Sequence, residues 1–184
     1  MSLGVDVSDC DISSVTRMTS AAAVAVCRAI EKTVGAEPLI KWVNDLYLGG
    51  KKVCGILAES FFVGERRFAV IGIGINLCTE DFPEDIKGIA GSLGKDGYTR
   101  RELTVAVAVE LFDLLTALVT KDASYMAEYR SRSLVLGRSV EIFTDGVTQT
   151  GVAVAIEDDG ALRVLLDDGT ERLLSSGEIS LRLR

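Results

Sequence analysis

The stretch that decides the fold is KWVNDLYLGGKKVCGILAES, residues 41–60. Strand-like residues flank Gly49-Gly50 on both sides, and two adjacent glycines readily adopt the positive φ angles of a two-residue turn. We therefore predict a strand over residues 38–43, a hairpin at LYLGGKKV and a returning strand over residues 51–60. A lysine, Lys41, stands among apolar residues at the start of this stretch.

The segments before and after this hairpin alternate between strand and helix patterns. Residues 1–13 predict a short strand followed by a loop. Ala, Val and Ile at three- and four-residue spacing predict a helix over Ser14–Val34. This helix is apolar on most of its surface and is therefore expected to be buried, with Gly35 as its C-cap. A further strand is predicted over residues 66–77.

The region that follows is predicted to be a loop and then helical. Residues 78–99 contain Pro83 and several glycines. Thr99 followed by Glu102 fits a capping box, in which each side chain accepts a hydrogen bond from the other residue's backbone, at the start of a long helix. A second helical stretch is predicted over residues 121–132.

The pattern changes near Gly137. Short β runs alternate from there with Asp-Gly turns at residues 145–146, 159–160 and 168–169. Several short strands in so short a segment indicate a small barrel. We therefore predict an α/β (α+β) chain, in which residues 1–136 form a mixed or antiparallel sheet packed with helices and residues 137–184 form a small β-barrel.

The composition excludes several classes of function. The chain has 184 residues and a net charge of −7, so it lacks the excess of Lys and Arg that phosphate contacts with nucleic acid require. It contains no histidine, which removes serine–histidine triads and most zinc sites. The four cysteines have no CxxC spacing, and no apolar run reaches the ~20 residues of a membrane span. We expect a cytoplasmic protein whose chemistry uses Lys, Arg, carboxylates, backbone amides or a hard metal ion.

The segment IGIGIN, residues 71–76, is the first candidate site. Alternate residues of a strand share a face, so its three isoleucines point toward a core and Gly72 and Gly74 leave the other face bare. Glycine weakens a strand, which calls for a bulge, a packed helix or the close approach of a ligand. If the two strands are neighbours, Gly55 joins these glycines in one flat surface that suits a small planar or bicyclic ligand.

The polar residues near these strands have two interpretations each. Asn76 either bonds its own backbone in a turn, or reads a base or helps to hold a metal-bound phosphate. Lys41 either extends its ammonium to solvent at the end of a sheet, or fixes a carboxylate or phosphate in a partly dry site. Asn44 and Asp45 either shape the turn or touch a substrate.

Taken together, KWVND, KKVCGILAE, VIGIGINL and the closing SSGEISLRL resemble the biotin protein ligase family (biotin–[acetyl-CoA-carboxylase] ligases). That family carries a KWPND block, a K-x-x-GIL-x-E strand and a GxGIN strand in this order. Each motif alone is weak, but the three in order together with the ending are specific. The resemblance extends over nearly the whole chain and implies a catalytic domain over residues 1–136 and an SH3-like barrel over residues 137–184.

The resemblance implies a two-step reaction. Biotin and Mg²⁺-ATP form biotinyl-5′-AMP and pyrophosphate, and the biotinyl group then passes to a lysine of a biotin carboxyl carrier domain. By position, the catalytic residue Lys41 would hold the biotin carboxylate and the α-phosphate. The same correspondence assigns contacts with biotin or the nucleotide to Gly55, Gly72, Gly74, Asn76, Asn44 and Arg182. It assigns no metal ligand in the chain, and a homodimer is expected.

Two departures from the family pattern bear on activity. Val43 stands where the KWPND block has proline. The family's Gly/Arg-rich segment, which folds over biotin and the phosphates, lies upstream of the region that resembles this chain, so we expect these residues alone to be a weak or inactive ligase. Two alternatives stay open: a lipoate ligase-like enzyme with acyl-adenylate chemistry, and a non-catalytic module that binds biotin or the carrier domain.

Overall fold

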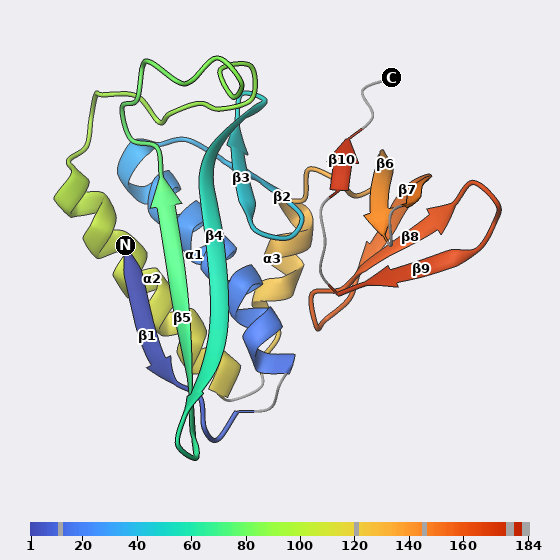
Figure 1. Cartoon of the computed structure of the whole chain (residues 1–184). Helices are drawn as coiled ribbons and strands as arrows, with labels where there is room; N and C mark the ends of the chain where they lie inside the picture. Colours follow the sequence, from blue (N-terminus) through green and yellow to red (C-terminus); the bar gives the residue numbers. More distant parts are fainter. Residues whose placement is uncertain (11–12, 120–121, 145–146, 176–178, 182–184) are drawn as a thin grey trace.

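The computed structural model describes residues 1–10, 13–119, 122–144, 147–175 and 179–181. Figure 1 shows a first sheet that carries three helices and a second, smaller sheet at the C-terminal end. The predicted fold class, an antiparallel sheet packed with helices and followed by a small β domain, is confirmed. The domain limits at residues 136 and 137 stay a prediction.

The first sheet is antiparallel throughout, with the strand order β1-β5-β4-β3-β2. Its strands are β1 (Ser2–Asp6), β2 (Leu39–Lys41), β3 (Asp45–Leu48), β4 (Lys51–Val63) and β5 (Arg66–Ile75). The predicted hairpin at Gly49-Gly50 joins β3 to β4, and both glycines have positive φ, 58° and 80°. The strand predicted over residues 38–43 is shorter, because residues 42–44 form the turn into β3.

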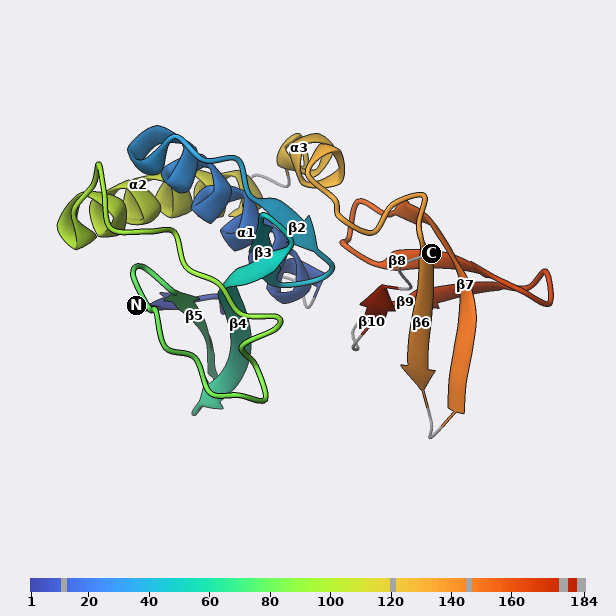
Figure 2. The same cartoon turned by 90° about the horizontal axis from the view of Figure 1, so that it is seen from above.

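The helix α1 (Ser13–Val34) lies at the centre of the core. Ala21 to Cys27 are fully buried, because this helix packs against the sheet on one side and against α2 (Arg100–Val119) and α3 (Tyr125–Ser131) on the others. Figure 2 shows the three helices together on one side of the first sheet. The buried helix predicted from its all-round apolar surface is confirmed, and Gly35 ends it with φ 72°.

The two later helices begin differently: α2 begins at a side-chain cap, whereas α3 follows a turn and its N-cap residue Ser124 makes no side-chain capping bond. The predicted capping box at α2 is formed: Glu102 Oε2 accepts from the Thr99 backbone N–H at 2.8 Å, and Thr99 Oγ1 accepts from the Glu102 N–H at 3.2 Å. The helix predicted over residues 121–132 is shorter than expected, because Asp122 bonds the Ser124 N–H at 2.8 Å in a turn that precedes α3.

A group of ion pairs ties the three helices together. Glu128 of α3 accepts from Arg28 of α1 at 2.6 Å and from Arg132 at 2.8 Å. Arg132 also pairs with Glu31 of α1, and Glu110 of α2 pairs with Lys32 of α1. Burial works to raise the pKa of Glu128, but the two guanidinium groups outweigh it and hold this pKa below its ordinary value of 4.5.

The second sheet contains five antiparallel strands in the order β10-β6-β7-β8-β9. They are β6 (Ser139–Thr144), β7 (Val147–Ile156), β8 (Leu162–Leu166), β9 (Glu171–Leu174) and β10 (Ile179–Leu181). Two of the predicted Asp-Gly turns are confirmed, with φ 89° at Gly160 and 85° at Gly169. The third, at residues 145–146, lies outside the described residues.

Replacing Glu128 with glutamine should remove about 1–2 kcal/mol from the free energy of unfolding at pH 7, since hydrogen bonds to charged groups contribute about this much. A carboxyl whose pKa is lowered by folding adds stability above its ordinary pKa, and this stability is lost as the pH falls below 4.5. Urea unfolding between pH 3 and 7 should therefore show a weaker acid dependence in the variant. Glu84→Gln, at an exposed carboxylate, is the control. Equal acid dependence in wild type and Glu128→Gln would contradict the stabilising role of the Glu128 carboxylate.

Candidate active site

The predicted glycine surface is formed where β4 pairs with β5. Gly55 lies directly opposite Gly74, and Gly72 lies two residues further along β5 on the same face, opposite Leu57. Ile71 and Ile73 point to the other face and are buried under α1. We call Gly55, Gly72 and Gly74 the glycine patch.

Packing within the chain does not explain these glycines. A Cβ atom added at Gly72 or Gly74 would come no closer than 3.7 and 3.8 Å to its nearest neighbour, a backbone oxygen in each case. The helices lie on the opposite face of the sheet (Figure 2), so a helix packed over the glycines is excluded for the described helices. The patch is therefore an open surface that a ligand could approach closely.

A lysine that the sequence prediction did not include lies over this patch. The Lys52 ammonium pairs with Asp45 Oδ1 at 2.6 Å. A Cβ atom at Gly55 would lie 3.5 Å from Lys52 Cε and 3.6 Å from Lys52 Nζ. Lys52 therefore holds a cation above the glycine patch, and Asp45 fixes its position.

A β-bulge explains why the alternation of side chains along β4 does not predict that Lys52 faces the glycine patch. In a regular strand, Lys52 and Gly55 would point to opposite faces. The register between β3 and β4 shifts so that Leu46 faces Cys54 while Tyr47 faces Lys52, which leaves Val53 as an extra residue. Val53 and Cys54 are both buried, so the extra residue turns Lys52 onto the face that carries Gly55.

Two pockets meet at this lysine. The open-face pocket, about 530 Å³, is lined by Met1, Ser2, Asn44, Asp45, Lys52, Gly55, Ile56, Leu57, Gly72, Ile73 and Gly74. The loop pocket, about 440 Å³, is lined by Lys52, Cys54, Gly55, Gly74, Asn76, Thr79, Phe82, Ile86, Ile89 and Ala90. Both volumes are in the range of small-molecule sites. Because Lys52, Gly55 and Gly74 belong to both, two ligands bound side by side would meet beneath the same ammonium.

The loop between β5 and α2 is attached to this site by backbone hydrogen bonds. Lys52 donates its backbone N–H to Ile89 O at 2.7 Å and accepts from the Gly91 N–H at 2.8 Å. Asn76 Nδ2 donates to Gly91 O at 3.0 Å. These bonds hold the apolar wall of the loop pocket beside Lys52.

The predicted site residues fall in different places. Asn44 lines the open-face pocket, where its Nδ2 donates to Ile56 O at 2.7 Å, and Asn76 lines the loop pocket. Lys41 lies opposite Asp45 in the register of β2 and β3 but lines neither pocket, and its ammonium lies 5.9 Å from the centre of the Tyr47 ring. Arg182 lies outside the described residues.

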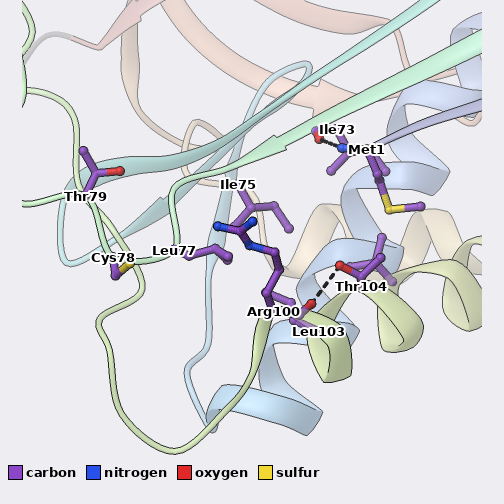
Figure 3. Close-up of a pocket in the computed structure, with 10 residues that line it drawn as sticks. Met1, Ile73, Ile75, Leu77, Cys78, Thr79, Arg100, Leu103 and Thr104 are labelled. Atoms are coloured by element: carbon purple, nitrogen blue, oxygen red, sulfur yellow. Dashed lines mark hydrogen bonds between the residues drawn. The ribbon is translucent and has the colours of Figure 1, made fainter.

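A third pocket lies on the helix side of the first sheet. Figure 3 shows it between the end of β5 and the first turns of α2, with Arg100 extending toward Ile75 and Leu77. Its volume is about 340 Å³, and none of the predicted site residues lines it. We assign no role to this pocket.

The described residues offer no resident metal centre and no membrane-spanning helix. No three carboxylates or thiolates among them gather closely enough to hold an ion. No helix in the described part of the chain combines the length and apolar character that crossing a bilayer requires.

Comparison with known proteins identifies the family. Residues 1–76 match the Biotin/lipoate A/B protein ligase family, and residues 135–182 match the Biotin protein ligase C terminal domain. The chain is 30% identical over 179 residues to the bifunctional ligase/repressor BirA of Bacillus subtilis, which covers 91% of this chain and 54% of that protein. It is 29% identical over 191 residues to the biotin–[acetyl-CoA-carboxylase] ligase of Mycobacterium tuberculosis, covering 100% of this chain and 69% of that protein.

Solved structures agree with this comparison. The biotin protein ligase of Aquifex aeolicus superposes with a TM-score of 0.81 at 25% identity, over 98% of this chain and 81% of that one. The same enzyme in complex with biotin and ATP gives a TM-score of 0.81 at 26% identity, over 98% and 76% of the two chains. The chain belongs to the biotin protein ligase family, and it spans about half the length of the Bacillus subtilis relative.

Replacing Gly74 with alanine should leave the free energy of unfolding unchanged or raise it by up to ~1 kcal/mol, because the new methyl group meets no close neighbour and alanine restricts the unfolded chain. Gly151→Ala is the contrasting variant, since its Cβ would lie 2.4 Å from Leu165 O, and it should cost about 1–3 kcal/mol through overpacking. Thermal unfolding of both variants tests the patch. A large loss in Gly74→Ala would mean that packing, and not an open ligand surface, requires glycine there.

Proposed function

We propose that this chain carries the catalytic machinery of an ATP-dependent biotin–protein ligase. The single observation that supports this most is that the open-face and loop pockets meet under Lys52. A reaction that joins a carboxylate to a nucleotide phosphate needs two ligands side by side with a fixed cation between them. Membership of the biotin protein ligase family supports the choice of biotin and ATP as those ligands.

The first step joins two anions. In the proposed arrangement biotin lies in the open-face pocket on the glycine patch, and the adenosine lies in the loop pocket among Phe82, Ile86 and Ile89. A carboxylate oxygen of biotin forms a bond to the α-phosphorus of ATP, and the bond from that phosphorus to the pyrophosphate oxygen breaks. The Lys52 ammonium reduces the repulsion between the carboxylate and the phosphate and stabilises the charge that develops between them.

The second step transfers the biotinyl group. The amine of a lysine in a biotin carboxyl carrier domain attacks the biotinyl carbonyl, an amide bond forms and AMP leaves. No histidine is available in the chain, so activation of the attacking amine relies on other groups. Magnesium enters this scheme as part of the Mg²⁺-ATP substrate, as the family resemblance implies.

Two lysines compete for the role of the cation. The position of the KWVND block assigns this role to Lys41, and the geometry of the two pockets assigns it to Lys52. The position of Lys52 above Gly55 favours it, whereas the Lys41 ammonium lies against Tyr47. Asn44 and Asp45 then act by shaping the turn and holding Lys52, and Asn76 holds the loop that lines the nucleotide side. A nucleotide contact from Arg182 stays a proposal from the family pattern alone.

The surroundings of the reaction are also proposals. A homodimer is expected from the family, and a cytoplasmic location is expected from the sequence. The four free thiols Cys10, Cys27, Cys54 and Cys78 are consistent with a reducing compartment. The expectation that these residues alone turn over weakly or not at all stays a prediction. The alternative of a lipoate ligase-like enzyme shares the adenylate chemistry, and the match of residues 135–182 to the biotin ligase C-terminal domain favours biotin over it.

Replacing Lys52 with methionine should reduce biotinyl-5′-AMP formation at least a hundredfold, since one fixed electrostatic contact in such a site contributes about 10²–10³ in rate. Lys41→Met is the matched control and should retain the rate within about threefold if its ammonium only covers Tyr47. Formation of labelled adenylate from biotin and α-³²P-ATP, with circular dichroism of both variants, measures this. A collapse in Lys41→Met with normal turnover in Lys52→Met would reverse the assignment.

Calorimetry separates the ligase from a non-catalytic module. If the two ligands meet under Lys52, a non-hydrolysable ATP analogue should tighten biotin binding about tenfold, the size of a typical coupling between sites. Gly55→Ala and Gly74→Ala should weaken biotin binding, whereas Gly4→Ala, in open space on β1 outside the patch, should not. Biotin binding with no effect of the nucleotide would support the module, and lipoate binding in preference to biotin would support the other alternative.

A further inference from the structure

One turn of the small C-terminal domain contacts both the KWVND segment, residues 41–45, and α3. Residues 157–161 connect β7 to β8, and the buried indole of Trp42 donates from Nε1 to Gly160 O at 2.9 Å. Arg130 of α3 holds the same turn by donating from Nε to Ile156 O at 2.6 Å and by pairing with Asp158. The turn is therefore attached both to the KWVND block and to the helix beside it.

The turn itself is internally fixed. The Gly160 N–H donates to Glu157 O at 3.0 Å, and the Glu157 N–H donates to Ala161 O at 2.8 Å. Asp159 Oδ1 accepts from the Ala161 N–H at 2.9 Å. With Gly160 in the left-handed region at φ 89°, its carbonyl has one defined direction, toward Trp42.

The three residues after Trp42 each make a contact of their own. Tyr129, next to Arg130 on α3, donates its hydroxyl to Val43 O at 2.9 Å. Asn44 exchanges two hydrogen bonds with Ile56: its O accepts from the Ile56 N–H at 3.0 Å, and its Nδ2 donates to Ile56 O. Asp45 then binds Lys52 at 2.6 Å. An unbroken series of contacts leads from the small domain to the Lys52 ammonium.

We propose that the β7–β8 turn of the small domain positions the Lys52–Asp45 pair through Trp42, so that Trp42 and Gly160 are positioning residues of the active site. The hydrogen bond from Trp42 Nε1 to Gly160 O fixes the direction of the indole ring. An aromatic ring without an N–H would fill the same space but would not be held in that direction. Loss of the Gly160–Trp42 bond frees the 42–45 segment, and Asp45 then holds Lys52 less firmly over the patch. Only the catalytic consequence of this coupling rests on the proposed ligase function.

Hydrogen exchange in the full chain tests the coupling without any substrate. Trp42 is the only tryptophan, so its indole N–H gives one unique NMR signal. The Ile56 amide, which donates to Asn44 O, reports the position of the 42–45 segment. Arg130→Met removes two contacts to the turn and should speed exchange of both protons about fivefold, the factor that corresponds to one neutral hydrogen bond. Trp42→Phe should do the same at Ile56.

The control variant is Arg66→Met, which loses an ion pair with Asp6 at the far end of the first sheet and should leave both protons within twofold of wild type. The proposal is overturned if Arg130→Met speeds exchange of the Trp42 indole while the Ile56 amide keeps its wild-type rate. Arg130→Met keeps the buried indole in place, so it answers the question even if Trp42→Phe does not fold.

Adenylate formation supplies the catalytic readout. Trp42→Phe should lower kcat about fivefold and leave the KM values for biotin and ATP within twofold, because the ligands do not touch Trp42 in the proposed arrangement. An unchanged kcat in a folded Trp42→Phe variant would contradict the positioning role. Weak or absent adenylate formation in wild type matches the expectation for these residues alone. If wild type binds neither biotin nor the ATP analogue, the proposed function fails, whereas the exchange experiment still decides whether the turn holds the segment.

Discussion

The pairing of β4 with β5 is the constraint on which the rest of the structure depends. It extends from Cys54 opposite Ile75 to Val63 opposite Arg66 and sets the glycine patch on one face and the isoleucines on the other. Because side chains alternate along a strand, a shift of one residue would turn the glycines toward α1 and the isoleucines toward solvent. Burial of the isoleucines under α1 therefore fixes the register that exposes the patch.

The candidate active site is built from backbone as much as from side chains. The glycines allow a ligand to approach the strands closely, and the residues that bear charge are a single ion pair, Lys52 with Asp45. In the proposed reaction, a lysine over a surface without side chains provides a fixed positive charge where the two anions would meet. This arrangement suits a chain that contains no histidine, because joining a carboxylate to a phosphate demands charge compensation more than proton transfer.

The two β structures contribute unequally to the site. Every described residue of the open-face and loop pockets lies in or next to a strand of the first sheet, or in the loop between β5 and α2. The second sheet contacts the site indirectly, through a turn whose carbonyl meets the indole of Trp42. The ion pairs of Arg28, Glu110, Glu128 and Arg132 lie away from both pockets and serve to join the helices.

Most of the fold could be predicted from the sequence because its signals are local. The Gly49-Gly50 turn, the apolar helix α1, the Thr99–Glu102 capping box and the two described Asp-Gly turns, at Gly160 and Gly169, each follow from the conformations that a few neighbouring residues prefer. Strand ends are predicted less well, at residues 42–43, 61–63 and 76–77, since tertiary contacts and not local preference decide where pairing stops.

The sequence by itself determined the resemblance to the family and the face of IGIGIN that carries no side chains. Side chains alternate regularly along β5, so the face of each residue follows from its position in that one strand. Only the tertiary structure decided which lysine faces the glycine patch. The extra residue Val53 is accommodated as a bulge against β3, and this bulge turns Lys52 onto the patch while Lys41 lies by Tyr47. A bulge depends on the pairing of two strands, so the side that Lys52 faces cannot be deduced from the order of residues in one of them.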